Sequence, residues 1–177
     1  MPEKVYIKKR YHTDIWNINQ NLQTIINPYF EKKNIKINKI EQANGPLSST
    51  ANDEDSQDWI LDIEELKDLI KWIEKEILKA TEFFYKREYK YIYTGRIFMN
   101  KMNKNSSAKW HHHTVNGLIG IFYLNAPKNS AKLLTKNEDI IVETGDLIIH
   151  KPNLKHAVSE HLIEEPRISL IYEAIFE

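Results

Sequence analysis

The chain has 177 residues, with 25 Lys and Arg against 25 Asp and Glu, and it contains no cysteine. This length favours a single domain, and a hydrophobic fraction of 41% is typical of a globular protein with a packed core. Equal numbers of basic and acidic residues argue against general nucleic-acid binding. The absence of cysteine excludes thiol catalysis, iron–sulfur clusters and disulfide frameworks.

The first residues, MPEKVYIKKRYHTD, lack the apolar core of a signal peptide, and no apolar run approaches the roughly 18 residues of a membrane span. We therefore expect a cytoplasmic protein that does not associate with a membrane. Six of the seven histidines lie between His111 and His161. Since thiolates are absent, any metal ion would be held by imidazole or carboxylate.

The first half of the chain, residues 1–88, is predicted to be a helical lead-in. Apolar residues recur at helical spacing over residues 17–28, which end at a proline. Residues 41–58 are polar and rich in turn formers, which predicts a loop over the mouth of any pocket. Asp62 and Glu65 resemble a capping box at the start of a longer helix. The apolar stripe of this helix is Ile63, Leu66, Leu69, Ile70, Ile73, Ile77 and Phe84.

From residue 89 the hydrophobic period changes to two, which is typical of β-strands. Short strand candidates follow one another without a helix between them, separated by Asn-Gly, Gly-Asp and proline. The expected strands are 89–99, 109–113, 118–125, 131–134, 139–142, 147–150, 156–159 and 167–176. This pattern predicts a sandwich, barrel or jelly roll over residues 89–177. The fold class is therefore α+β, mainly β, with N-terminal helices supporting the β core.

Three consecutive histidines, His111 to His113, follow Trp110 on a predicted strand. Because side chains alternate between the faces of a strand, we expect His111 and His113 on one face and a structural His112 on the other. Two imidazoles on one face can bind one metal ion, and neutral imidazole suits iron, copper, zinc and nickel. The alternative is a surface cluster of histidines that binds no metal.

A second group runs from a Gly-Asp turn at Gly145 through a strand to a break at Pro152. His156 follows four residues later and can reach the interior that the first histidine pair faces. Taken alone, His156 is also typical of a histidine in a core or at its rim. The remaining histidines of this half, His150 and His161, are not assigned to a metal.

Arg167 and Ser169 share one face of the last predicted strand. A guanidinium does not lose its charge, so an arginine that faces a barrel interior needs an anionic partner. Its planar fork matches a carboxylate, and the neighbouring serine hydroxyl adds a further donor. A salt bridge at the end of the strand is the alternative interpretation.

Together, these groups resemble the 2-oxoglutarate- and Fe(II)-dependent oxygenases of the double-stranded β-helix fold, in particular small bacterial and phage members. The resemblance covers about residues 90–177 and implies a jelly-roll or cupin-like core. The matching stretches are HHHTVNGLIGIFYLN from His111, GDLIIH from Gly145, Pro152, His156, and RISL from Arg167.

The resemblance implies that His111 and His156 bind Fe(II). Most of this superfamily has His-x-Asp or His-x-Glu at the first ligand pair, which gives two histidines and one carboxylate. In this chain His113 stands where the carboxylate is expected. The centre then has three histidine ligands, or His113 lies beside a metal that lacks one protein ligand.

The resemblance also implies the co-substrate. Arg167, helped by Ser169, would bind the distal carboxylate of 2-oxoglutarate, and Tyr123 would line the same pocket. The expected activity is oxidative decarboxylation of 2-oxoglutarate coupled to hydroxylation, or a related C–H oxidation, of a small-molecule or peptide substrate.

Two other functions fit parts of the pattern. A cupin-type three-histidine dioxygenase that does not use 2-oxoglutarate fits the histidines, but residues 114–120 lack the expected glutamate and Arg167 has no role in it. A non-catalytic jelly-roll binding module makes the histidines incidental. Trp59, Tyr93 and Trp110 are candidate substrate contacts. An open sheet edge or the apolar helix stripe offers a homodimer surface, and the sequence does not determine the oligomeric state.

Overall fold

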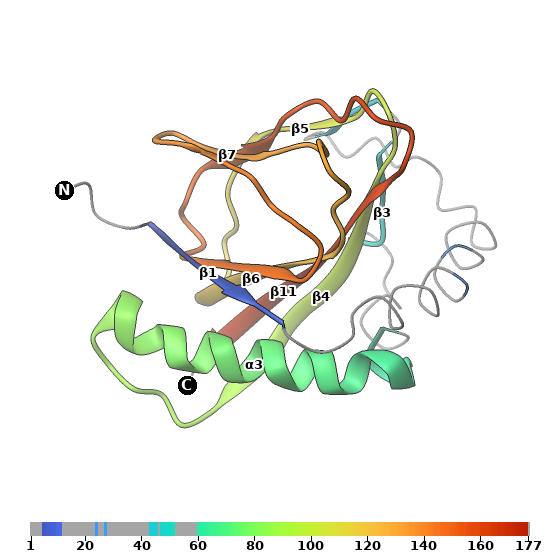
Figure 1. Cartoon of the computed structure of the whole chain (residues 1–177). Helices are drawn as coiled ribbons and strands as arrows, with labels where there is room; N and C mark the ends of the chain where they lie inside the picture. The colour runs from blue at the N-terminus through green and yellow to red at the C-terminus, as the bar shows by residue number, and fades with distance from the viewer. Residues whose placement is uncertain are drawn as a thin grey trace.

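The computed structural model describes residues 5–11, 24, 27, 43–45, 47–51 and 60–176. Trp59, all but two positions of the helix expected over residues 17–28, and much of the loop expected over residues 41–58 lie outside the described residues. Two antiparallel sheets face each other, and a long helix covers the outer face of the larger sheet (Figure 1).

The larger sheet has the strand order β1-β9-β6-β11-β4-β3, and the smaller sheet has the order β2-β5-β10-β7-β8. The strands of the larger sheet are β1 (Tyr6–Arg10), β3 (Leu47–Ser49), β4 (Ile92–Met102), β6 (Gly117–Asn125), β9 (Asp146–His150) and β11 (Arg167–Phe176). Those of the smaller sheet are β2 (Ala43–Asn44), β5 (Ser107–His111), β7 (Leu133–Thr135), β8 (Asp139–Ile140) and β10 (His156–Val158). Between β4 and β11 the chain passes back and forth between the two sheets, as in a jelly roll. The predicted fold class is confirmed.

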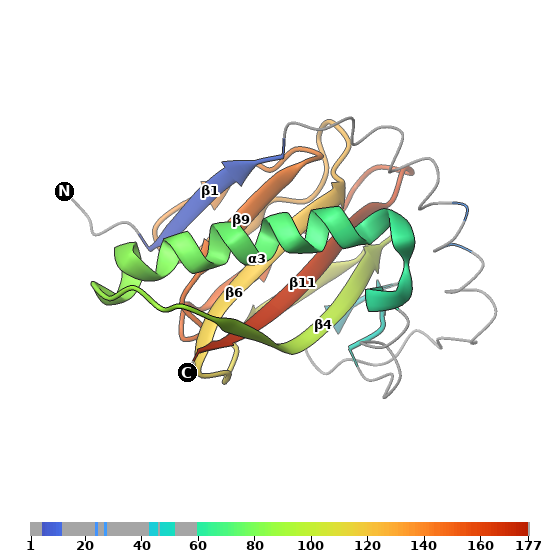
Figure 2. The same ribbon diagram turned by 90° about the horizontal axis from the view of Figure 1, so that it is seen from below.

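Helix α3 (Glu64–Tyr85) crosses the strands of the larger sheet, as Figure 2 shows from below. The predicted capping box is wrong, because Ile63 is the N-cap residue and makes no side-chain cap hydrogen bond. Glu64 and Glu65 instead place negative charge in the first turn, where it stabilises the helix dipole. The predicted apolar stripe is confirmed by its buried members, which are Ile63, Leu66, Leu69, Ile70, Ile73 and Ile77.

Among the described residues, this layering gives two large apolar cores and a small third cluster of Leu47, Met102 and Ala131. One lies between α3 and the larger sheet and includes Ile168, Leu170 and Tyr172 of β11. The other lies between the two sheets and includes Ile171 of the same strand. The side chains of β11 thus alternate between the two cores, as predicted. This alternation directs the odd-numbered residues of β11 into the space between the sheets.

Strands β1, β2 and β3 were not expected in the helical lead-in. Strand β1 pairs with β9 at the edge of the larger sheet. The buried Asp146 of β9 holds β1 through ion pairs to Lys8 at 2.8 Å and to Arg10 at 3.0 Å. A short, charged edge strand has no period of buried residues, so the sequence pattern could not indicate it.

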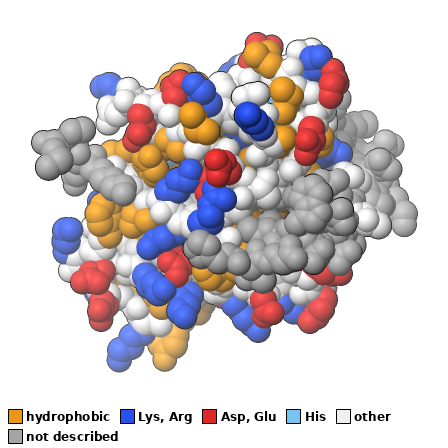
Figure 3. Space-filling view, in the orientation of Figure 1, with side chains coloured by type: hydrophobic (Ala, Val, Ile, Leu, Met, Phe, Trp, Pro, Cys, Tyr) orange, Lys and Arg blue, Asp and Glu red, His pale blue; other side chains and the backbone are white. Residues whose placement is uncertain are grey.

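Basic and acidic side chains are interspersed on the face of the molecule that Figure 3 shows. This mixture agrees with the equal numbers of the two kinds of residue in the sequence. Among the helices that the structure describes, none is both long enough and apolar enough to cross a membrane.

Candidate metal and co-substrate site

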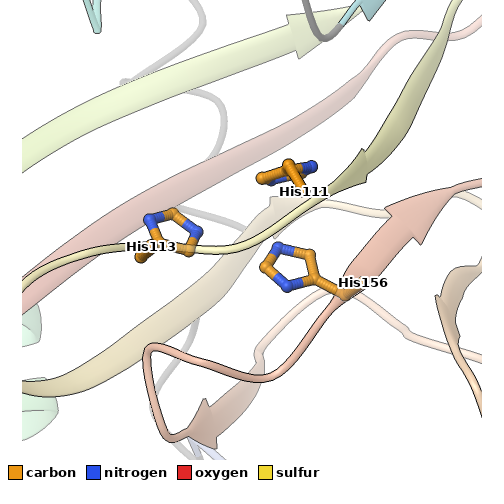
Figure 4. A group of neighbouring side chains, drawn as sticks. All are labelled: His111, His113 and His156. Carbon is orange, nitrogen blue, oxygen red and sulfur yellow. The ribbon is translucent and has the colours of Figure 1, made fainter.

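His111, His113 and His156 lie together between the two sheets, as predicted (Figure 4). Each offers one ring nitrogen, and these atoms all lie within 4.8 Å of one another. His111 is the last residue of β5 and pairs directly with His156 at the start of β10. The predicted strand is too long at this point, because β5 ends before His113. His113 is positioned instead by its backbone N–H, which donates to the carbonyl of Pro152 at 2.9 Å.

The Nδ1 atom of each of these histidines is already hydrogen-bonded. His111 donates to the carbonyl oxygen of Lys109 at 2.8 Å, and His156 donates to that of Leu154 at 3.0 Å. His113 donates to a carboxylate oxygen of Glu173 at 2.7 Å. Because the proton is on Nδ1 in each ring, Nε2 carries the free lone pair. Fixed tautomers of this kind are typical of histidines that ligate a metal.

Burial keeps two of these rings neutral. Desolvation by burial, with a smaller contribution from His150 and His111, lowers the pKa of His156 to about 2. Burial also lowers the pKa of His111. A protonated imidazole cannot bind a metal, so the lowered pKa values leave these lone pairs available at neutral pH.

A pocket of about 520 Å³ opens beside the histidines, within the range of small-molecule sites. Arg167, Ser169 and Tyr123 line it together with all three histidines, so the structure brings all six predicted site residues together. The guanidinium of Arg167 is buried, and its carbon lies 4.7 Å from the centre of the Tyr123 ring.

Three residues that line the pocket have buried polar atoms without a hydrogen-bond partner among the described residues. Arg167 donates a weak hydrogen bond to the sulfur of Met102, at 3.2 Å, and its Nε has no hydrogen-bond partner among the described residues. The Tyr123 hydroxyl and the Asn100 carbonyl oxygen are unpartnered as well. Within the described part of the chain, Arg167 forms no ion pair with a carboxylate. A buried cation in this state fits an anionic ligand that enters the pocket.

No family model and no curated protein sequence matches this chain, but solved structures do. The collagen prolyl hydroxylase of Paramecium Bursaria Chlorella virus-1, solved as a 2-oxoglutarate complex, has a TM-score of 0.62 and 13% identity, and the match covers 97% of this chain and 96% of that one. CytC3 with Fe(II) and α-ketoglutarate has a TM-score of 0.65 and 13% identity, over 98% of this chain and 74% of that one. The Trichoplax adhaerens prolyl hydroxylase, in complex with a peptide fragment of the hypoxia-inducible factor, has a TM-score of 0.61 and 14% identity. This match covers 95% of this chain and 83% of that one.

The chain has the fold of the 2-oxoglutarate- and Fe(II)-dependent oxygenases. The match extends over nearly the whole chain, so it includes α3 as well as the two sheets. At these identities the likeness concerns the fold. Any activity has to be argued from the residues of the pocket.

Several other predicted residues lie away from the pocket interior of this oxygenase fold. His112 is exposed at the pocket rim, where the sequence predicted a structural residue on the other face. Trp110 and Tyr93 are also exposed and do not line the pocket, so the structure gives no support to their predicted substrate contacts. His161 is a structural histidine that accepts a hydrogen bond from the backbone N–H of Ala131 at 3.3 Å and donates one to a backbone carbonyl.

Sequence reasoning missed Glu173 and the position of His150. Glu173 lies on the inward face of β11 and contacts His113, but 60 residues separate the two, so no local spacing indicates the contact. His150 is fully buried, and its ring centre lies 4.9 Å from that of His156. Its Nδ1 donates to the carbonyl of Lys151 at 2.8 Å, and its Nε2 has no hydrogen-bond partner in the part of the chain that the structure describes. The strand alternation of β9 could have placed His150 inside, two residues beyond the buried Ile148.

Acid should destabilise the metal-free protein through His150. Burial lowers the pKa of His150 to about 4, whereas an unfolded histidine has a pKa of about 6.5. The unfolded chain therefore takes up the proton first, so the free energy of unfolding falls as the pH drops from about 6.5 towards 4, by on the order of 3 kcal/mol for this group. Chemical denaturation of the wild type and of His150→Phe at several pH values tests this. We expect a shallower pH dependence in the variant, and equal slopes would contradict the assignment.

Proposed function

We propose that this protein is an Fe(II)- and 2-oxoglutarate-dependent oxygenase. The observation that carries this proposal is the meeting, in one pocket, of three histidine nitrogens fixed for metal binding and a buried guanidinium without a carboxylate partner in the described residues. The fold of the solved oxygenases supports it.

His111, His113 and His156 would hold the ion. Imidazole nitrogen suits Fe(II), and the three rings line the pocket, whose remaining space is available to further ligands. When bound, the ion supplies dioxygen activation, coupled to the oxidative decarboxylation of 2-oxoglutarate to succinate and CO₂. The protein fixes the rings through their Nδ1 hydrogen bonds.

Arg167 would bind the distal carboxylate of 2-oxoglutarate. Its guanidinium fork matches a carboxylate, and the neighbouring Ser169 is buried on the same face of β11. The unpartnered Tyr123 hydroxyl would complete the polar end of the pocket. These residues orient the co-substrate and exclude water from its far end.

The remainder of the pocket would admit part of a small-molecule or peptide substrate. Its volume of about 520 Å³ exceeds what a five-carbon diacid occupies. The Trichoplax adhaerens prolyl hydroxylase, which has this fold, was solved with a peptide fragment. One atom of dioxygen would enter the oxidised C–H bond and the other would enter succinate.

An anaerobic titration tests the proposal. Fe(II) followed by 2-oxoglutarate should produce a weak visible charge-transfer band that saturates at one equivalent of each. Admission of oxygen should then yield succinate. Iron binding without any response to 2-oxoglutarate would instead favour the cupin-type dioxygenase, which the all-histidine donor set also fits. If the protein binds no divalent metal, both metal-dependent functions are excluded, and the non-catalytic jelly-roll binding module is the remaining function.

A further inference from the structure

One of the three histidines differs from the others in its hydrogen-bond partner. The Nδ1 atoms of His111 and His156 donate to backbone carbonyls, whereas that of His113 donates to the Glu173 carboxylate at 2.7 Å. The side chains of His113 and Glu173 are 11% and 12% exposed, so solvent screens this contact little. A full negative charge therefore lies one hydrogen bond away from a candidate metal ligand.

The backbone of β11 directs Glu173 into this position. Glu173 pairs with Arg96 of β4, but Ala174 pairs with Thr94, so the register slips by one residue at Gly95. The extra residue belongs to β4, and β11 pairs with β6 without a slip at this point, so the regular alternation of β11 places Glu173 on the inward face. Although Arg96 and Glu173 are paired in register, no ion pair joins them in the part of the chain that the structure describes. The carboxylate is directed at His113 instead.

The charges of the filled site give this contact a role. Arg96 also lines the pocket, but it is exposed and solvent screens its charge. Among the remaining groups, with neutral histidines, the two positive charges of Fe(II) and the one of Arg167 face the two carboxylates of 2-oxoglutarate, which leaves one positive charge uncompensated. Glu173 supplies the missing negative charge. A net charge in a largely buried site is costly, so neutrality stabilises the loaded state.

We propose that Glu173 is a positioning residue that supplies to the metal, through His113, the negative charge that a directly ligating carboxylate would provide. This inference rests on the proposed function. A carboxylate that accepts the Nδ1 proton fixes the ring and makes Nε2 a stronger electron donor. His113 stands where a carboxylate ligand is expected, and Glu173 of β11 thereby supplies the negative charge that this position lacks.

Glu173→Gln separates charge from geometry, because the amide oxygen can still accept the Nδ1 proton of His113. We expect a 10- to 100-fold weaker affinity for Fe(II), measured by competition with a chelator in the absence of 2-oxoglutarate. The charge-transfer band with 2-oxoglutarate should move to shorter wavelength, since a less electron-rich iron is harder to oxidise. A purely structural role would not shift this band.

Glu74→Gln is the matched control. Glu74 of α3 accepts a hydrogen bond from the Tyr172 hydroxyl at 2.7 Å, on the opposite face of β11. This variant also loses one negative charge, beside Tyr172, which precedes Glu173 on β11. We expect its iron affinity and the wavelength of its charge-transfer band to match those of the wild type. If the wild type binds no iron, the proposed function fails. If the wild type binds iron and 2-oxoglutarate and Glu173→Gln matches it in affinity and band position, only the inference about Glu173 is overturned.

Discussion

Replacement of His156 by alanine is expected to raise the dissociation constant for Fe(II) by more than about 100-fold. Loss of a residue that merely orients a ligand costs 10- to 100-fold in metal affinity, so loss of a ligand should cost more. His156 is the cross-strand partner of His111, and its ring centre lies 4.3 Å from that of His111. Its removal therefore also frees the neighbouring ring. Chelator competition or isothermal titration under anaerobic conditions measures the change.

His112→Ala is the control for this experiment. His112 adjoins two of the proposed ligands in sequence but is exposed and does not belong to the cluster of ring nitrogens. We expect its iron affinity to stay within about 2-fold of the wild type, a change of less than about 0.5 kcal/mol. His156→Gln, which keeps a polar side chain, guards against loss of the fold. If both His156 variants bind iron with the affinity of the wild type, His156 is not a ligand of the metal.

Replacement of Arg167 by methionine should abolish the response to 2-oxoglutarate while iron still binds. Truncation of one partner of a buried charge pair costs about 2–5 kcal/mol, which corresponds to an increase of about 30-fold or more in the dissociation constant for 2-oxoglutarate. The charge-transfer titration measures this affinity, and a chelator competition run in parallel measures that of iron.

The same variant should be more stable than the wild type when no ligand is bound. Within the described part of the chain, the weak Met102 hydrogen bond and the Tyr123 ring compensate the buried guanidinium, and no carboxylate does, so an apolar side chain of similar length removes a desolvation cost. We expect the Tm of the metal-free protein to rise by about 2 °C or more. A variant that is more stable but binds 2-oxoglutarate more weakly would show that Arg167 serves ligand binding and not the stability of the fold.

Arg96→Met provides the comparison within the same pocket. Arg96 is exposed, lies over the Phe98 ring and donates to the carbonyl of Ala51. Its loss should leave the affinity for 2-oxoglutarate within about 3-fold of the wild type, as is usual for an exposed charge. If Arg96→Met loses the charge-transfer response and Arg167→Met retains it, the co-substrate lies at the other end of the pocket.

Strong local patterns made much of this fold predictable. The period-two alternation of β11 placed Arg167 and Ser169 on the inward face, and the apolar stripe of α3 identified its buried side. Each of these patterns depends on a long element that is buried on at least one face. The predicted and observed bounds of β11 coincide for the same reason.

The parts that could not be predicted depend on contacts between distant residues. Strand β1 is held by Asp146, far along the chain, and its own sequence is mostly charged. His113 was expected to continue a strand, but the hydrogen bond from its backbone N–H to Pro152 positions it beyond the strand end. The contact between His113 and Glu173 joins the loop after β5 to the larger sheet, and neither residue has a neighbour in sequence that indicates the other.

The strand order of the larger sheet has a consequence for how the chain folds. Tyr6 pairs with His150, Leu47 with Met102, and Met99 with Leu170, so this sheet is built from segments that lie far apart in the sequence. Pairings of this kind give a high contact order, and chains with a high contact order fold slowly compared with helical proteins. The pocket draws on both sheets, because the histidines come from the smaller sheet and the loop after β5, whereas Tyr123, Arg167 and Ser169 come from the larger sheet. The complete pocket therefore forms only when these distant segments have paired.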